Sequence, residues 1–383
     1  MVAEAKIICE QSTSLSVSIR PDFFDLSTAS SKTLVDICAS ESVSVELTRS
    51  ESVVRCSTII DASSFESGAS KYVPSIRSGS HTDIGPRHRN EDEHICVDDL
   101  SAQLGSHYMW PLPSSFYAVF DGHGGSEAAA YVKNNAMRLF FEDTPLPQVY
   151  DNDDKLLEDL RNSHQKAFSL ADQSLADECT VCDFCGTTAL TALVFGNHLL
   201  VANAGDSRAV LCRKGVAVPM SEDHRPSCLP EQMRVKRLGG YIEDGYLNGE
   251  LAVTRALGDW YMKSPSGCPA PLTAEPDVQQ TLLTEDDEFL ILGCDGIWDV
   301  MSNQEAVRLV RSTLRQHDDP QECAKALVDQ ALRLNTSDNL TAIVICFTSP
   351  VKQRESVPQR PKSRCFSLSE DARIRLMSLL QGN

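Results

Sequence analysis

The sequence lacks three features that would each indicate a class of protein. No segment offers the roughly 18 uninterrupted apolar residues of a membrane-spanning helix, and the start, MVAEAKIICEQSTSLS, has no basic stretch followed by a sufficient apolar run. Basic residues are scarce as well, since 35 Lys and Arg stand against 54 Asp and Glu, a net charge of −19. Such a charge repels nucleic acid and anionic membrane surfaces. We therefore expect a soluble, intracellular protein with neither of these as a partner.

Cysteine is plentiful, but the pattern of a disulfide framework is missing. The chain has 14 Cys, and several lie in apolar runs where a buried thiol is expected: Cys212, Cys294, Cys323 and Cys346. Buried free thiols are typical of proteins in a reducing compartment. The cysteines therefore favour the cytoplasm or the nucleus.

The cysteine cluster in ECTVCDFCGTT lacks the further ligands that a metal site needs. Cys179, Cys182 and Cys185 are three residues apart, a spacing that could supply thiolates to zinc or an iron–sulfur cluster. No second knuckle provides the remaining ligands, and Cys185 opens the strand-like run CGTTALTALVFG. We expect a structural role for these cysteines and no bound metal.

Three regions of the chain differ in composition. Residues 1–74 are rich in Ser and Thr, with candidate strands in SLSVSIR and SVSVELTR, and we expect a largely flexible extension. Residues 75–349 alternate strand-like and helix-like patterns and form the expected folded domain. Residues 350–383 begin rich in Pro and charge and end in SLSEDARIRLMSLL, where Ser367 and Glu370 form a candidate capping box for a short helix.

Within 75–349 the pattern predicts β-hairpins covered by pairs of helices. Apolar residues recur at three- and four-residue spacing in the segments where we expect helices: 126–142, 154–178, near 230–240, 303–316 and 320–334. Consecutive strands meet at the turn dipeptides GN at 196–197 and KG at 214–215, and the polar stretch 221–286 is expected to hold several loops beside its short helix. No internal repeat is evident. This order indicates an α+β layered domain, not a doubly wound one.

The segment SFYAVFDGHGG, residues 115–125, is a β-strand pattern that ends abruptly in a glycine loop. One interpretation is a tight turn, because glycine adopts positive φ without steric cost. The other is a metal site, in which the strand fixes the carboxylate of Asp121 while bare glycine backbone lets a carbonyl oxygen approach the same ion. The motif alone does not decide between them.

Acidic residues recur at the ends of apolar strands, which favours the metal site. Strands of packed sheets end at common edges, so these carboxylates could converge although more than two hundred residues separate them. The positions are Asp121, Asp206, Asp295 and Asp338, with Glu91 and Asp92 beside a further strand. Single Asp residues at strand ends are ordinary turn formers. A group of this size is not stable without cations, because like charges disfavour ionisation, and oxygen ligands indicate hard ions such as Mg²⁺ or Mn²⁺.

A series of motifs resembles the successive signatures of the protein phosphatase 2C family, the metal-dependent protein serine/threonine phosphatases. They occur in the family's order over about residues 76–349: RHRNED, FDGHGG, CGTTA, ANAGDSRAV, GELAVTRALGD, GCDGIWDVMS and SDNLTAIV. The resemblance, greatest to plant members, implies a four-layer α-β-β-α sandwich with two central antiparallel β-sheets and the metal centre at one edge. This agrees with the order of elements.

The resemblance implies a set of metal ligands. Asp121 would bridge two Mg²⁺ or Mn²⁺ ions, and Gly122 would bind through its carbonyl oxygen. Asp295 and Asp338 would complete the shell of one ion, while Glu91 and Asp92 would hold the other, largely through water. Asp206 and Asp299 match carboxylates that hold a looser third ion near Asp295.

The resemblance also implies the catalytic residues and a mechanism. Arg87 would bind the substrate phosphate, a task that suits the guanidinium fork, and His123 would be the general acid. Two cations sharing a carboxylate make a bridging hydroxide available near neutral pH, so no covalent intermediate is needed. We expect a monomer that dephosphorylates phosphoserine and phosphothreonine proteins in signalling.

Two alternatives and one departure from the family pattern qualify this expectation. A catalytically silent member acting as a phosphoprotein-binding module would usually lose a ligand or the phosphate arginine, yet all matched positions are intact. A two-metal nuclease conflicts with the charge of −19. The variable flap, residues 228–250, lacks the tryptophan found in the plant members that act as hormone co-receptors, which argues against that role.

Overall fold

The computed structural model describes residues 72–105, 112–142, 153–178, 180–263 and 270–348, together with residues 4–7, 15–18 and 378. The chain divides into two units, Met1–Ala69 and Ser70–Asn383. In the first, β1 (Glu4–Ile7) pairs antiparallel with β2 (Leu15–Ser18), which is the strand predicted in SLSVSIR. The predicted strand SVSVELTR and the predicted capping box of the tail lie outside the described residues. The boundaries at 74 and 349 stay predictions.

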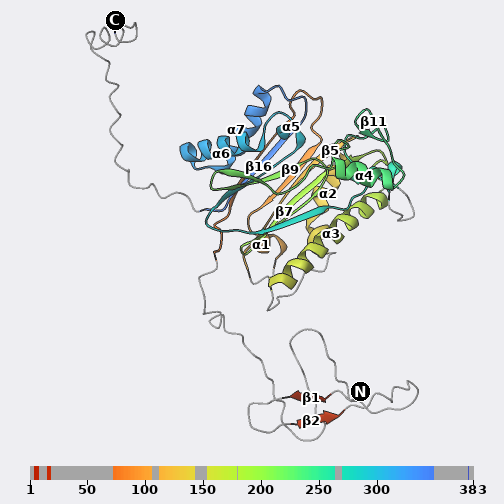
Figure 1. Ribbon diagram of the computed structural model, residues 1–383, viewed down its shortest axis with the longest axis vertical. Coiled ribbons are helices and arrows are strands. Elements are labelled where there is room, and N and C mark those ends of the chain that lie inside the picture. Colours follow the sequence, from red (N-terminus) through yellow and green to blue (C-terminus); the bar gives the residue numbers. More distant parts are fainter. Residues whose placement is uncertain are drawn as a thin grey trace. The chain divides into compact units, whose positions relative to one another are not determined.

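The second unit is built on two antiparallel sheets (Figure 1). The smaller sheet has the order β10 (Val216–Pro219), β9 (Arg208–Arg213), β15 (Asp287–Gly293), β16 (Leu340–Cys346), β3 (Arg77–Asp83). The larger sheet has the order β13 (Leu257–Gly258), β6 (Gly186–Thr187), β5 (Ser114–His123), β7 (Ala189–Phe195), β8 (His198–Ala204), β14 (Asp277–Leu282), and β4 (Asp92–Val97) also pairs with β5.

Helices cover the outer face of each sheet. Against the smaller sheet lie α6 (Asn303–His317) and α7 (Pro320–Arg333), and against the larger sheet lie α2 (Glu127–Met137) and α3 (Asp153–Asp177) (Figure 1). The remaining short elements are α1 (Leu100–Leu104), η2 (Arg138–Glu142), α4 (Leu229–Arg237), β11 (Ile242–Glu243), β12 (Tyr246–Leu247), η3 (Trp260–Met262) and α5 (Asp295–Trp298). The structure confirms the predicted α+β fold with four layers, α-β-β-α.

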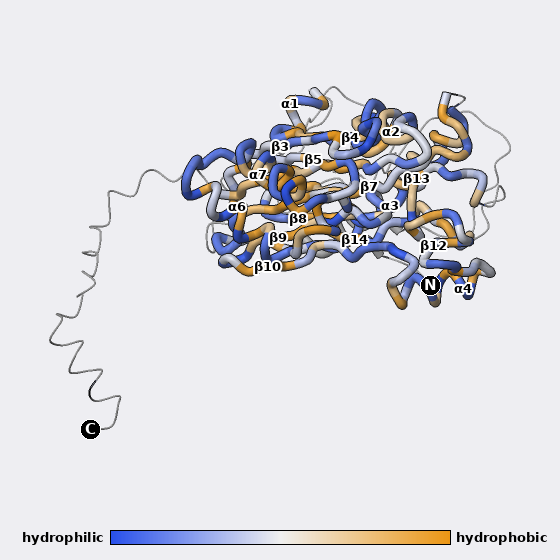
Figure 2. Tube along the Cα trace, turned by 90° about the horizontal axis from the view of Figure 1, so that it is seen from above, coloured by the Kyte–Doolittle hydropathy of each residue, from blue (hydrophilic) through white to orange (hydrophobic). Residues whose placement is uncertain are grey.

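Strand β5 shows why the layers form, because its side chains alternate between two apolar interfaces. Phe116 and Phe120 pack with the helices α2 and α3, whereas Tyr117 and Val119 pack with strands of the smaller sheet. A third apolar cluster lies between the smaller sheet and the helices α6 and α7. Figure 2 shows the hydrophobic stretches of the tube along inner strands such as β8 and β9. A strand that is buried on both faces reads as a continuous apolar run.

Local signals set the element boundaries where the sequence predicts them. Helix α6 begins with a full capping box, in which Ser302 and Glu305 each accept from the other's backbone N–H. The hairpins turn at 196–197 and at 214–215 as predicted, with Lys214 and Gly215 both at positive φ, the geometry of a two-residue type I′ turn. The helix expected over 126–142 consists of α2 followed by the π-helical turn η2.

The segment 277–282, within the stretch expected to hold several loops, is a strand that the sequence pattern does not predict. These residues form β14, which pairs along its whole length with β8 at the edge of the larger sheet. Its sequence DVQQTL has no apolar run because an edge strand is paired on one side only and stays half exposed. The backbone pairing therefore decides the conformation here, not side-chain burial.

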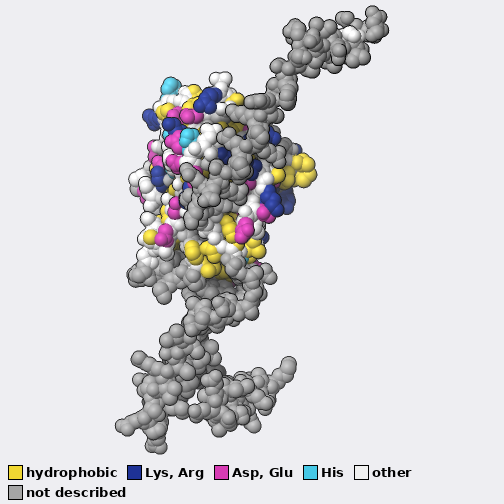
Figure 3. All heavy atoms as spheres, turned by 90° about the vertical axis from the view of Figure 1, so that its left-hand side faces the viewer, with side chains coloured by type: hydrophobic (Ala, Val, Ile, Leu, Met, Phe, Trp, Pro, Cys, Tyr) yellow, Lys and Arg dark blue, Asp and Glu magenta, His cyan; other side chains and the backbone are white. Residues whose placement is uncertain are grey.

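The surface carries both charges. On the face shown in Figure 3, the side chains of Lys and Arg are interspersed with those of Asp and Glu, so neither sign forms a separate field among the residues coloured there. Among the described residues, no helix combines the length and the apolar character needed to span a membrane.

Candidate metal and catalytic site

Four predicted carboxylates converge at one edge of the sandwich. Asp92 opens β4 and lies directly opposite Asp121 near the end of β5. Asp206 follows β8, and Asp295 begins α5 immediately after β15. Each therefore belongs to a different strand end, as the sequence pattern predicts. Ligand atoms form two groups, and within each group they lie within 4.8 Å of one another. The first group is Asp92, Asp121 and Cys294, and the second is Asp121, Asp206 and Asp295.

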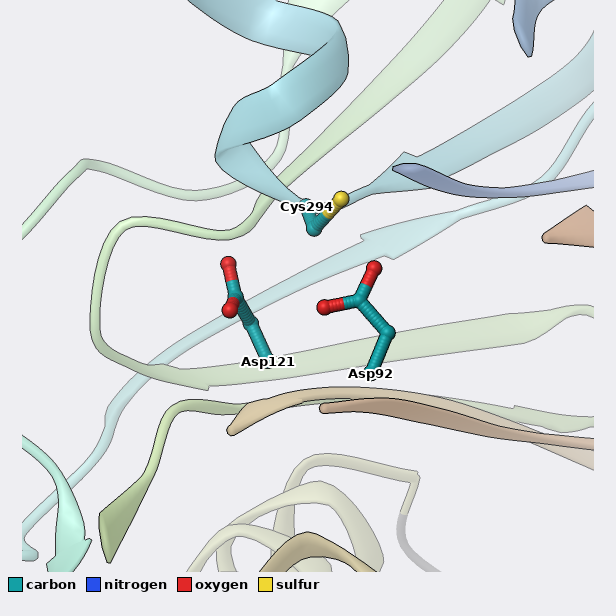
Figure 4. A group of neighbouring side chains, drawn as sticks. All are labelled: Asp92, Asp121 and Cys294. Atoms are coloured by element: carbon teal, nitrogen blue, oxygen red, sulfur yellow. The ribbon is translucent and has the colours of Figure 1, made fainter. Parts of the chain in front are cut away.

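In the first group Asp92 and Cys294 are buried and Asp121 is half-buried. Figure 4 shows the carboxylates of Asp92 and Asp121 side by side on neighbouring strands, with Cys294 above them at the start of α5. Asp92 Oδ2 accepts a hydrogen bond of 2.7 Å from the Thr341 hydroxyl, while its Oδ1 is buried without a hydrogen-bond partner among the described residues. A buried carboxylate oxygen with no donor is costly unless a cation binds it. The arrangement fits a metal ligand.

The second group surrounds a guanidinium. The Nε of Arg225 lies 2.9 Å from Asp206 Oδ2, and its Nη2 lies 2.7 Å from Asp299 Oδ1 and 3.5 Å from Asp295 Oδ2. The sequence analysis did not single out Arg225, which follows DH in the segment EDHRPS. This arginine neutralises part of the acidic cluster at the place where the family resemblance implies a looser third ion.

The carboxyl groups perturb one another's pKa values. Burial, followed by Asp92, Asp295, Asp206 and Asp338, raises the pKa of Asp121 well above its ordinary value. Burial is also the largest cause for Asp92, whose pKa rises to about 6, and for Asp295, whose pKa rises to about 8. The pKa of Asp206 is raised by burial too, and Arg225 opposes the rise. Full ionisation of this site at neutral pH therefore needs added positive charge, which divalent cations supply.

The donor set identifies the kind of cation. Carboxylate oxygens predominate, and they suit Mg²⁺ or Mn²⁺. Cys294 is the exception, but burial raises the pKa of its thiol well above the usual range. Its Sγ also accepts from Thr341 N at 3.1 Å, so Cys294 is a neutral thiol that packs beside the carboxylates. The residues present fit hard divalent cations.

Asp338 lies at the same edge but is engaged by an arginine. Arg87 Nη2 donates to Asp338 Oδ2 at 2.6 Å, and Arg87 Nε donates to the Ser337 carbonyl at 3.0 Å. The Arg87 side chain is 55% exposed, and its Nη1 has no partner among the described residues. The structure thus brings the predicted phosphate-binding arginine to a predicted metal ligand, with one nitrogen free toward solvent.

Glu91 and Gly122 are joined through the backbone. Gly122 N donates to the Glu91 carbonyl at 3.2 Å, and a Cβ at Gly122 would clash with that oxygen, so the close approach requires glycine. Glu91 N in turn donates to Asn339 Oδ1 at 2.9 Å, while Asn339 Nδ2 donates to the carbonyls of Ile84 and Arg89. Asn339, which the sequence analysis missed, ties the loop of Glu91 to the start of β16. Its position next to Asp338 was the available signal.

His123 ends β5 and makes a strong polar contact. Its Nε2 lies 2.7 Å from Oδ2 of Asp259, a carboxylate that is 1% exposed. The His123 ring itself is 27% exposed, so one side reaches solvent. Asp259 is a second residue that the sequence analysis did not single out, although it closes the quoted motif GELAVTRALGD.

The cysteine cluster lies beside the same loop. Cys182 and Cys185 have their Sγ atoms 2.8 Å apart, and the Cys185 thiol donates to the Gly124 carbonyl at 3.2 Å. Burial raises the pKa of Cys185 to about 12, which keeps it a thiol. Cys179 lies outside the described residues, so the expected absence of a bound metal stays a prediction.

Known proteins match this chain over most of its length. The family model described as "Protein phosphatase 2C" matches residues 76–340. The rice (Oryza sativa subsp. japonica) protein "Probable protein phosphatase 2C 47" is 59% identical over 327 residues, 84% of each chain. "Probable protein phosphatase 2C 13" of Arabidopsis thaliana is 55% identical over 351 residues, 91% of each chain.

A solved structure shows the same architecture. The crystal structure of serine-threonine phosphatase 2C from Toxoplasma gondii superposes with a TM-score of 0.59 at 25% identity, over 73% of this chain and 98% of that one. The chain therefore shares nearly the whole fold of that enzyme, and the curated relatives extend the similarity through most of their own length.

Proposed function

Since the chain belongs to the protein phosphatase 2C family and is a metal-dependent protein serine/threonine phosphatase by that membership, we propose that it hydrolyses phosphoserine and phosphothreonine monoesters with two bound Mg²⁺ or Mn²⁺ ions and no covalent intermediate. One observation carries the proposal. Asp92, Asp121, Asp206 and Asp295 meet at one edge, and burial together with repulsion from neighbouring carboxylates raises their pKa values. Such a group is stable in its charged form when it binds cations.

The proposed ligands divide according to their positions. Asp121 belongs to both groups of converging atoms, which supports a bridging role between two ions. Gly122 would bind through its carbonyl oxygen. Asp295 and Asp338 would complete the shell of one ion, and Glu91 and Asp92 would hold the other. Asp206 and Asp299 would bind a looser third ion only where Arg225 yields its place between them. The unpartnered Asp92 Oδ1 supports its part in this set.

The chain's own residues bind the substrate and move its proton. Divalent cations held by these carboxylates would supply a hydroxide nucleophile near neutral pH by acidifying bound water. Arg87 would orient the phosphate through Nη1, while its other nitrogens stay fixed by Asp338 and Ser337. His123 would donate a proton to the departing serine or threonine oxygen, a leaving group that is poor as an anion.

The proposal extends to partners and place of action. The enzyme would act as a monomer. Its partners would be its substrates, the phosphorylated proteins of signalling. The eight cysteines with described side chains are free, and most of them are buried, which supports action in a reducing compartment such as the cytoplasm or the nucleus.

Chelation tests the proposal. The purified chain, treated exhaustively with EDTA, should no longer hydrolyse a phosphoserine peptide. Added Mg²⁺ or Mn²⁺ should restore hydrolysis, and adding Ca²⁺ instead tests whether the restoration depends on ion size. Single turnover with a ³²P-labelled peptide should leave no label on acid-quenched protein. Full activity in EDTA, or a labelled protein intermediate, would refute the assignment.

A further inference from the structure

The pair formed by His123 and Asp259 lies where the end of β5 meets two short strands, β6 and β13. Gly186 of β6 lies opposite His123 of β5 and also opposite Gly258 of β13, so β6 stands between the histidine and the aspartate. A Cβ at Gly186 would clash with both His123 Nε2 and Asp259 Oδ2. The strand therefore leaves room for the contact only because residue 186 is glycine.

The backbone at Asp259 is held in an unusual conformation. Its φ of 52° and ψ of 43° lie in the left-handed region, and its N–H donates to the Cys185 carbonyl at 3.0 Å. Residues in that region cluster at functional sites, where the surrounding structure imposes them. Here the conformation directs the carboxylate to the histidine, across 136 residues of sequence.

The Asp259 carboxylate has few other partners. It is 1% exposed, and its Oδ1 is buried with no hydrogen-bond partner among the described residues. The nearby ammonium of Lys263 donates instead to Asp172 Oδ1 at 2.6 Å and to the Ala256 carbonyl at 2.8 Å. The imidazole Nε2–H is therefore the principal polar contact of the Asp259 carboxylate. This contact matters because a buried carboxylate is costly unless it is paired.

From this geometry we propose that Asp259 is a positioning residue for His123, fixing Nε2 as the nitrogen that always carries a proton and leaving Nδ1 to serve the substrate. The proposal rests on the proposed phosphatase function and deepens it. Nδ1 has no partner among the described residues, and the ring is partly exposed. Asp259 holds the tautomer in the way that the aspartate of a Ser-His-Asp triad does, with the two ring nitrogens exchanged.

The proton transfer balances as follows. Hydroxide forms a new bond to phosphorus while the bond from phosphorus to the serine oxygen breaks and its electron pair stays on that oxygen. The oxygen takes the proton from Nδ1 of the imidazolium. The ring becomes neutral with its remaining proton on Nε2, still donated to Asp259, and water returns a proton to Nδ1 before the next turnover.

Replacing the carboxylate by its isosteric amide tests the proposal by leaving group. Asp259→Asn should lower kcat on a phosphoserine peptide about 100-fold, within the range of general-acid assistance, and on an aryl phosphate less than about threefold, because that leaving group needs no proton. Asp244→Asn is the matched control, an exposed aspartate with a φ of 51° in the turn between β11 and β12. It should leave both rates unchanged.

A double mutant separates positioning from a general structural effect. If Asp259 acts only through His123, the variant that combines Asp259→Asn with His123→Gln should be no slower on the peptide than His123→Gln alone, within about twofold. Equal losses of Asp259→Asn on both substrates, or additive losses in the double variant, would show that Asp259 has another role and overturn the proposal.

The tautomer is measurable in the unaltered protein. Long-range ¹⁵N–¹H correlation spectra of the magnesium-bound chain, with His123 assigned by its loss in His123→Gln, should show a neutral ring protonated at Nε2. A neutral ring protonated at Nδ1 would contradict the proposal even if Asp259→Asn fails to fold. A wild-type chain with no hydrolysis of either substrate would sink the proposed function, while the tautomer would still test the contact.

Discussion

Replacing Asp295 by asparagine should stabilise the metal-free protein, although Asp295 is a proposed ligand. Burial, with Asp206, Asp338 and Asp299, raises its pKa from 3.8 to about 8 in the folded chain. A carboxyl group with a raised folded-state pKa favours folding fully below its unfolded pKa, and that contribution is lost as pH rises toward the folded value. In EDTA the wild-type protein should therefore become less stable between about pH 4 and pH 8.

The magnitude follows from the interval between the two pKa values. At about pH 7.5, ionisation of Asp295 favours the unfolded chain by roughly 1.36 kcal/mol for each pH unit above 3.8, or about 5 kcal/mol as an upper bound. The amide is free of this cost, but it weakens the contact with Arg225 at 3.5 Å. We expect a net stabilisation of about 2 kcal/mol, which is roughly 4–8 °C in Tm for a domain of this size.

Thermal unfolding in EDTA, followed by circular dichroism, measures this difference. The advantage of Asp295→Asn should fall by about 2 kcal/mol from pH 7.5 to roughly pH 6, because the interval shrinks by 1.5 units. Saturating Mg²⁺ should reverse the order, since the wild type gains more from the ion. Asp244→Asn, at an exposed turn, should match the wild type throughout. A variant that is equally or less stable than the wild type at pH 7.5 in EDTA would refute the electrostatic reasoning.

Two further substitutions probe the arginines of the site. Arg87→Ala should lower kcat/KM for a phosphopeptide about tenfold or more, and Arg87→Lys should be intermediate. The reason is that a charged hydrogen bond to phosphate is worth roughly 1.5–3 kcal/mol and the side chain is half exposed. An unchanged kcat/KM would show that Arg87 does not bind the substrate. Arg225→Ala should lower the Tm in EDTA and raise the affinity for the most weakly bound Mn²⁺, because Asp206, Asp295 and Asp299 lose the guanidinium that they share. Electron paramagnetic resonance measures the Mn²⁺ affinity. Unchanged Mn²⁺ binding would show that Arg225 does not compete with an ion.

The layers of the fold were predictable because burial leaves a strong pattern. Strands such as β15 and β16 are buried along most or all of their length, so their sequences are apolar runs. The capping residues Ser302 and Glu305 mark the start of α6. Strand β14 was not predictable, since its polar residues are held by backbone pairing to β8 at the sheet edge. Edge strands carry little of the periodicity on which such predictions depend.

The convergence of carboxylates was predictable because each lies at or near a strand end, and strands of one sandwich share an edge. The partners that adjust them were not. Asp259 reaches His123 through a left-handed residue in a loop, and Arg225 enters the acidic cluster from another loop. Neither has a periodic signal, because long-range contacts between loops depend on the completed fold. A buried thiol at Cys294 was expected, but its place beside Asp92 and Asp121 was not.

The central claim is that Asp121 joins two divalent cations and that both are needed for turnover. The most direct test counts bound Mn²⁺ by isothermal titration calorimetry and measures phosphoserine-peptide hydrolysis on the same EDTA-treated samples of wild type and Asp121→Asn. The account predicts that the wild type regains turnover as two ions bind, whereas Asp121→Asn binds neither tightly and stays at least about 10³-fold slower at saturating Mn²⁺. Turnover near the wild-type rate in Asp121→Asn, or in wild-type protein with no ion bound, would contradict it.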